Sequence, residues 1–523
     1  MYTFTTIDKF VRVENEAFTL DNNPFFPMIL NYSVSVRTIN NSIVIGPSRE
    51  YDHPSEFDAY TKVGVELRLE THFKLIKSMG FNSLRIVGLN DPTYSDDRIG
   101  SLQLETHDSL TLIQTTYENK RESYLKALGE LIKIAKKEDL KVMLILPRPQ
   151  KDFVKNTSRI NYIKDILMTF SKEPTVFAYD FFNEPLYFDN AEYTEYDLVI
   201  RDKLDAYNLV KFWKELMTTY APNQLFTIGF AEPLEVMEWD PTILPLDFVS
   251  FHTYHPLRVA SEIYWFSKYV NKPWIISETS LPADNDSISY KSQEIFMKEI
   301  LQKTKDCGGV GFGWWQYQEV DWRVFEHDFT ALVNLEGKTY ASNGEFIIGS
   351  VKPAGRVIPN FQFQPIGNCN CPDNYYNILG YEKYKITGKV INEKTGEGIE
   401  GAVIRSWNQD WSIGLNTFTD ENGVFNLYSN QKCVHFNISA PGMSFVSTSK
   451  TPQEFHYLKN NDADFTAAID TTLEYHSIHF QTFLKDKDPE KSTLEFDEKY
   501  FSKFRFYTEM EDVLLREVEI NPH

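Results

Sequence analysis

Short apolar runs alternate with longer amphipathic segments through most of the first 350 residues. Eight runs stand out, at 25–32, 81–88, 140–147, 175–183, 224–230, 247–254, 273–278 and 309–317. Most of them are almost continuously apolar, as strands buried on both faces of a parallel sheet are. Apolar residues at three- and four-residue spacing predict helices between them, at 62–80, 121–138, 200–217 and 292–305. This alternation predicts βα units and an α/β fold.

Eight strands over this length fit a (β/α)8 TIM barrel. The alternative is a doubly wound open sheet, which normally carries a glycine-rich phosphate-binding turn after its first strand. Here the first run is followed by NYSVSVRTINNS, which contains no glycine. We therefore favour the barrel, with long loops after its first, second, fourth and eighth strands.

The pattern of apolar runs and amphipathic segments ends at about residue 365, which indicates further domains. Short alternating stretches broken by TGEG, DENG and APG are typical of a small all-β sandwich. The C-terminal stretch is charged and aromatic, and it either adds two strands or forms an accessory element. The predicted division is a catalytic barrel at 1–365, a linker at 366–383, a sandwich at 384–470 and an accessory segment at 471–523.

Composition excludes some classes of partner. The net charge of −21, from 53 basic and 74 acidic residues, repels phosphate backbones and argues against nucleic acid. No apolar run is long enough to predict a membrane-spanning helix. The four cysteines show no zinc-site spacing. They do not fix a compartment, and the oligomeric state stays open as well.

Two carboxylates fall at predicted strand ends, where the reactive groups of a barrel lie. Asn183 and Glu184 end the fourth run, and Glu278 ends the seventh. Acetal cleavage needs such a pair, with one carboxyl protonated to assist the leaving oxygen and the other ionised. Their environments must therefore separate the two pKa values. A simpler interpretation is that Glu184 caps a following helix and Glu278 forms an ion pair.

The pattern of strand ends resembles clan A glycoside hydrolases, most closely family 5, the cellulase and mannanase-like family. The resemblance covers roughly residues 15–355 and begins with FTLDNNPFFPMILNY. It continues with Asn-Glu-Pro after the fourth strand, His-x-Tyr after the sixth, Glu after the seventh and Trp after the eighth. The family implies a retaining double displacement without metal or cofactor, in which Glu184 is the acid/base and Glu278 the nucleophile.

The resemblance also implies five substrate-binding or positioning residues. Asn183 would bond the sugar 2-hydroxyl, and Trp315 would be the stacking floor. His252 and Tyr254 would orient the carboxylates, and Arg85 would hold Glu278 ionised. The expected partner is a carbohydrate substrate.

The segment after the barrel resembles a carboxypeptidase regulatory-like domain, an immunoglobulin-like sandwich. The phrases that carry this resemblance are ITGKVINEKTGEGIEGAVI and TDENGVFNL. Such modules accompany extracytoplasmic enzymes, so we expect a secreted, periplasmic or surface protein whose signal is absent from this chain. The N-terminus MYTFTTIDKF shows no signal pattern, and a cytoplasmic location is the alternative.

Two other functions remain compatible with these residues. A non-catalytic carbohydrate-binding barrel would be expected to lack one carboxylate, whereas both are present here. A transglycosylase would use the same site and pass the sugar to another sugar instead of water. The sugar, the linkage and endo or exo action are not set by these motifs.

Overall fold

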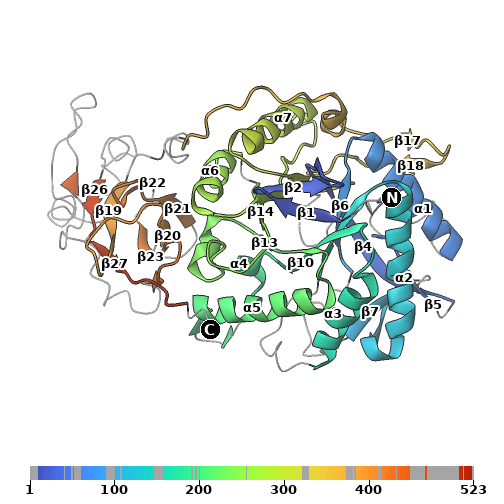
Figure 1. The fold of residues 1–523 in the computed structure, drawn as a ribbon. Coiled ribbons are helices and arrows are strands. Elements are labelled where there is room, and N and C mark those ends of the chain that lie inside the picture. The colour runs from blue at the N-terminus through green and yellow to red at the C-terminus, as the bar shows by residue number, and fades with distance from the viewer. Residues whose placement is uncertain are drawn as a thin grey trace, which may run out of the picture. The chain divides into compact units, whose positions relative to one another are not determined.

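The computed structural model describes the chain as two compact units, shown in Figure 1. The first comprises 1–200, 207–232 and 244–370, and the second 201–206, 233–243 and 371–523. The described residues exclude 1–9, 41, 49–50, 52–60, 90–100, 107–108, 147–156, 190–192, 195–196, 199–200, 255, 321–328, 373–380, 382–383, 409–413, 431–432, 448–465, 468–505, 511 and 521–523. None of the described helices combines the length and the apolar character needed to cross a bilayer.

The first unit is built on eight parallel strands. They are β4 (Met28–Ile39), β6 (Ser83–Val87), β9 (Lys141–Ile145), β10 (Val176–Asn183), β13 (Leu225–Phe230), β14 (Val249–His252), β15 (Trp274–Glu278) and β16 (Phe312–Trp314). Each strand pairs with the next, and β16 pairs back with β4 in parallel, which closes the ring. The predicted parallel barrel is therefore confirmed, and each strand overlaps one of the eight apolar runs.

Helices lie between the strands and around them in Figure 1. They are α1 (Lys62–Ser78), α2 (Tyr117–Lys137), α3 (Thr157–Phe170), α4 (Pro185–Phe188), α5 (Lys203–Tyr220), α6 (Val259–Tyr269) and α7 (Tyr290–Asp306). Side-chain caps explain two of the starts. Thr61 accepts a bond from the Gly64 amide before α1, and Ser289 accepts one from the Ser292 amide before α7.

The amino-terminal end of the barrel is covered by a small antiparallel sheet of β1 (Val11–Glu14), β2 (Ala17–Leu20) and β3 (Asn23–Pro24). Its buried residues, Val11 and Phe18, join one apolar cluster with residues at the beginnings of the barrel strands. Phe18 packs edge-on against Phe248, with ring centroids 5.2 Å apart. This end is thus filled by apolar side chains, which leaves chemistry to the carboxyl end.

The segment after the first strand is not the predicted loop. β4 continues to Ile39 and pairs with β5 (Ser42–Pro47) in an antiparallel hairpin, and β7 (Ser101–Thr106) and β8 (Ser109–Thr116) extend the same sheet. The prediction was wrong because SVSVRTI alternates β-branched residues with polar ones, a pattern that favours a strand. Val34 and Val36, in this part of β4, are buried.

Smaller elements complete the two units. Two-stranded sheets pair β11 (Tyr193–Thr194) with β12 (Asp197–Leu198), and β17 (Lys338–Tyr340) with β18 (Phe346–Ile348). The 3₁₀ helices are η3 (Pro233–Met237), η4 (Pro353–Arg356) and η5 (Ile358–Asn360).

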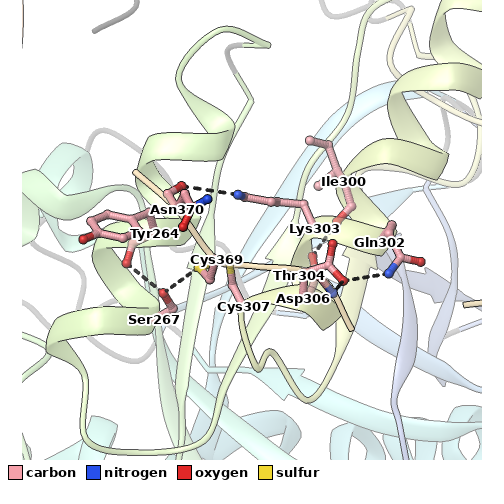
Figure 2. Close-up of a disulfide and its surroundings, with 11 residues drawn as sticks. Tyr264, Ser267, Ile300, Gln302, Lys303, Thr304, Asp306, Cys307, Cys369 and Asn370 are labelled. Atoms are coloured by element: carbon pink, nitrogen blue, oxygen red, sulfur yellow. Dashed lines mark hydrogen bonds between the residues drawn. A yellow bond between two sulfur atoms is a disulfide. The ribbon is translucent and has the colours of Figure 1, made fainter. Parts of the chain in front are cut away.

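A disulfide joins Cys307, directly after α7, to Cys369 (Figure 2). The Asp306 carboxylate accepts a bond from the Gly367 amide at 2.8 Å, and Lys303 donates to the Asn370 carbonyl at 3.4 Å. The segment that leaves the barrel unit is therefore fixed to the end of α7. Cysteine spacing did not predict this pair, whose members lie 62 residues apart.

The second unit contains two β-sheets. Its strands are β19 (Tyr384–Asn392), β20 (Val403–Asn408), β21 (Gly414–Phe418), β22 (Val424–Ser429), β23 (Cys433–Ser439), β24 (Val446–Ser447), β25 (Thr466–Ala467), β26 (Phe506–Glu509) and β27 (Val513–Leu515). One sheet has the order β22-β19-β26-β25, with β27 also on β19, and the other has the order β21-β20-β23-β24. Residues from both sheets, among them Val390 and Phe436, form one apolar core.

The end of the chain belongs to this second unit. β26 and β27 both pair with β19 in parallel, so part of the predicted accessory segment supplies two strands to a sheet. Residues 471–505 of that segment lie outside the described part of the chain.

Candidate active site

Arg85 on β6 is the centre of a buried polar cluster inside the barrel. It donates to Asp180 Oδ2 from Nε at 3.0 Å and from Nη2 at 2.7 Å. Nη1 donates to Asn31 at 3.0 Å and to Glu278, and Nη2 donates to Asn183 at 2.7 Å. Burial lowers the pKa of Arg85, but the charges of Asp180 and Glu278 outweigh it, so the pKa is raised. The guanidinium is therefore a fixed positive charge that connects four strands.

Glu278, at the end of β15, receives two donors. Arg85 bonds Oε1, and the Tyr254 hydroxyl bonds Oε2. The Glu278 side chain is 6% exposed, so these bonds act in a region with little water. Both donors stabilise negative charge on this carboxylate.

Glu184 follows β10 and has an unusual backbone conformation. Its φ of 50° lies in the left-handed region, a conformation that costs a non-glycine residue roughly 1–3 kcal/mol and often marks a functional site. Its amide donates to the Gly229 carbonyl at 2.7 Å, and Pro185 begins α4 directly after it. Glu184 occupies the N-cap position, yet its side chain makes no capping hydrogen bond. The carboxylate instead contacts His252.

His252, at the end of β14, lies between the two carboxylates. Its Nδ1 is 2.7 Å from Glu184 Oε1, and its Nε2 is 3.5 Å from Glu278 Oε1. Burial lowers the pKa of His252 to about 4, against an opposing effect of Glu278, so the ring is neutral near pH 7. The neutral ring has one N–H, so it either donates to Glu184 or accepts from it.

The same three residues bring one ligand atom each within 4.8 Å of the others. Two carboxylates and one imidazole are ligands that a divalent cation accepts. However, Arg85 already places a positive charge on Glu278, and Tyr254 donates to its other oxygen. Both oxygens of Glu278 therefore already accept hydrogen bonds from protein donors.

Trp314 and Trp315 differ in their surroundings. Trp314 ends β16, is fully buried and donates from Nε1 to the Thr330 carbonyl at 2.9 Å. Trp315 is half-buried just beyond the strand end, and its peptide bond to Gln316 is cis. Of the two residues, Trp314 is fully buried, whereas Trp315 is partly exposed.

Three residues of the cluster, Asn31, Asp180 and Gly229, were not predicted as site residues from the sequence. Asn31 donates from Nδ2 to the carbonyls of Ser277 at 2.8 Å and Trp314 at 3.0 Å while accepting from Arg85. A Cβ on Gly229 would lie only 2.8 Å from Asp180 Oδ2, 2.9 Å from Arg85 Nη2 and 3.0 Å from His252 Nε2.

A signal for each of them was present in the sequence. Asn31 and Asp180 are polar residues within apolar runs, and Gly229 is a glycine inside a strand, which often marks a close approach of other groups to the backbone.

Neither a family model nor a curated protein sequence matches the chain. Among solved structures, the endo-1,4-β-mannanase of Rhizomucor miehei has 18% identity and a TM-score of 0.41, and the match covers 59% of this chain and 90% of the mannanase. GH5_18 of Streptomyces cattleya in complex with GlcNAc has 13% identity and a TM-score of 0.44. The match covers 71% of this chain and 85% of GH5_18. The Bacteroides uniformis β-glucuronidase has 13% identity and a TM-score of 0.41. The match covers 84% of this chain and 47% of the glucuronidase. The TM-scores are all below 0.5, so these matches carry no argument about activity or substrate, and the fold rests on the strand pairing described above.

Proposed function

We propose that the chain is a retaining β-glycoside hydrolase acting on an oligo- or polysaccharide, with Glu184 as general acid/base and Glu278 as nucleophile. The observation that carries this proposal is that one oxygen of Glu184 lies within 4.8 Å of one oxygen of Glu278. Retaining pairs are about 5–5.5 Å apart, whereas inverting pairs at about 6.5–9.5 Å leave room for water. The short separation favours direct attack by a carboxylate.

The reaction proceeds in two balanced steps. In the first, a Glu278 oxygen bonds to the anomeric carbon while the glycosidic C–O bond breaks, and the proton of Glu184 goes to the leaving oxygen. In the second, ionised Glu184 takes a proton from water, the water oxygen bonds to the anomeric carbon, and the ester bond to Glu278 breaks. Both steps use only two carboxylates and water, so they require no metal or cofactor.

The surrounding residues have matching roles in this proposal. Arg85 and Tyr254 donate to the two oxygens of Glu278 and fix its orientation. Neutral His252 can hydrogen-bond Glu184 in both of its protonation states. In one tautomer Nδ1 accepts a hydrogen bond from the protonated carboxyl, and in the other it donates one to the carboxylate. Asn183 is assigned to the sugar 2-hydroxyl, and Trp315 to stacking on the sugar.

The proposal extends to the second unit and to location. Its two sheets around one core support a carboxypeptidase regulatory-like, immunoglobulin-like module, and the pairing of β26 and β27 with β19 supports a domain that extends beyond residue 470. The Cys307–Cys369 disulfide supports an extracytoplasmic location, because disulfides persist in oxidising compartments.

The test is hydrolysis of a panel of aryl β-glycosides, mannan, glucan and xylan by the wild type and by Glu184→Gln and Glu278→Gln. We expect wild-type hydrolysis with retention of anomeric configuration, read by proton NMR, and near-complete loss in both variants. Azide should restore turnover of an activated aryl glycoside in Glu184→Ala, because azide needs no general base. Inverted product, or full activity in Glu278→Gln, would refute the mechanism. Transfer to a second sugar in place of water would identify a transglycosylase.

A further inference from the structure

An exposed aromatic residue lies close to the proposed acid/base. Tyr187 is on α4, three residues after Glu184, and its amide donates to the Glu184 carbonyl at 3.0 Å. The residue is 56% exposed, yet its hydroxyl donates to Glu232 Oε1 at 2.5 Å. Burial of this hydroxyl and the nearby Glu232 raise the pKa of Tyr187, so the hydroxyl stays a donor. The ring is thus presented outward and held at its far end.

Glu232 is itself held from the opposite side. It follows β13, is 5% exposed, and accepts from Arg258 Nη1 at 3.2 Å. Arg258 Nε lies 3.7 Å from Glu262, and Glu262 accepts from the Thr253 hydroxyl. Thr253 stands between His252 and Tyr254 in the chain, so the contacts connect the loop after β10 with the loop after β14.

This network has no part in the two-carboxylate chemistry. Glu232 is largely buried, so it loses hydration and must be paired, which costs free energy. In return, its carboxylate holds the exposed tyrosine ring in one position. A ring fixed in this way loses little freedom when a ligand packs on it. The arrangement therefore suits a binding platform better than a freely rotating surface tyrosine does.

We propose that Tyr187 is the platform for the first sugar of the leaving group, an inference that rests on the glycosidase function proposed above. In a double displacement the nucleophile and the leaving group occupy opposite sides of the anomeric carbon. Glu278 defines the first side, and Glu184, which protonates the leaving oxygen, defines the second. The leaving sugar consequently lies on the Glu184 side, and Tyr187 lies in the short helix that Glu184 precedes. Its ring face attracts the polarised C–H groups of a pyranose.

The discriminating experiment compares two leaving groups on one glycosyl unit. The substrates are the β-linked oligosaccharide that the panel identifies and the corresponding glycosyl fluoride, whose leaving group contacts no platform. Tyr187→Ala should lower kcat/KM for the oligosaccharide roughly tenfold or more, because an aromatic contact is lost. The kcat/KM for the glycosyl fluoride should stay within about twofold of the wild-type value. Tyr187→Phe keeps the ring, so its kcat/KM for the oligosaccharide should fall only about a few-fold.

Tyr340→Ala is the matched control, since Tyr340 is a 70% exposed tyrosine on the separate β17–β18 sheet. It should leave both substrates unaffected. Equal loss on both substrates in Tyr187→Ala, or no loss on either, would overturn the inference while leaving the glycosidase function intact. A wild-type protein that cleaves neither substrate would overturn both.

Discussion

Arg85 on β6 donates a hydrogen bond to Glu278 on β15, and their side chains are 0% and 6% exposed. The same guanidinium binds Asp180, which is also fully buried. Two carboxylates in the barrel interior therefore share one cation, and the proposed nucleophile is paired with a residue from another strand.

Replacing Arg85 should destabilise the barrel strongly. Arg85→Met leaves two buried carboxylates without their cation, and breaking a buried pair costs about 3–5 kcal/mol. We expect a loss of this size in the free energy of unfolding, measured by urea titration with tryptophan fluorescence. Lys136→Ala is the control, because it removes a pair with Glu173 that is 56% and 25% exposed. Its loss should stay below about 1 kcal/mol. Equal losses would contradict the central position of Arg85.

Gly229→Ala should inactivate the site while leaving the fold intact. The added methyl group would lie within 3.0 Å of polar atoms of Asp180, Arg85 and His252, so these groups must move. We expect at least a tenfold loss of kcat, because displacements of about 1 Å cost up to a hundredfold. In Gly129→Ala the new methyl meets only Phe170 at 3.8 Å, and activity should not change. Unaltered turnover in Gly229→Ala would show that the cluster tolerates displacement.

His252 should make stability fall in acid. Its folded pKa of about 4 lies below the unfolded value of 6.5, mainly because of burial, so the unfolded chain binds this proton first. The stabilising contribution is present above pH 6.5 and is lost as pH falls towards 4. His252→Gln removes this contribution, so its melting temperature should vary less than that of the wild type between pH 6.5 and 4. If the melting temperatures of the variant and the wild type changed equally with pH over this range, the result would contradict a neutral buried imidazole.

Glu262 should have the opposite effect. Burial, with the neighbouring charge of Glu232, raises its pKa from 4.5 to about 7, against an opposing effect of Arg258. Its stabilising contribution is therefore complete below pH 4.5 and is lost as pH rises through 7. Glu262→Gln keeps the shape and removes the titration. The variant should gain stability relative to the wild type as pH increases from 4.5 to 8, measured by thermal unfolding. A constant difference across this range would refute the assignment.

The barrel strands were predictable because strands buried on both faces leave long apolar runs, as in β10 and β13. The hairpin of β4 and β5 was not recognised, because its alternating pattern looked like a polar loop. The strand-end rule selected Glu184 and Glu278, and the family resemblance added Arg85. In the structure Arg85 bonds Glu278, and His252 lies between Glu278 and Glu184. Their catalytic roles remain predictions.

Other features depend on contacts that a sequence does not display. The need for glycine at position 229 arises only when three side chains converge on its Cα. The outward presentation of Tyr187 depends on Glu232 and Arg258, which come from loops after two other strands. The Cys307–Cys369 disulfide likewise required knowing where the chain leaves the barrel.

The most direct test of the proposed mechanism is to trap the covalent intermediate. The protein is incubated with a 2-deoxy-2-fluoro β-glycosyl fluoride of the preferred sugar, digested, and mapped by mass spectrometry. The predicted result is one glycosyl group per chain on the peptide that contains Glu278, with no label in Glu278→Gln. A label on another residue, or continued turnover with no label at all, would contradict the assignment of Glu278 as the nucleophile.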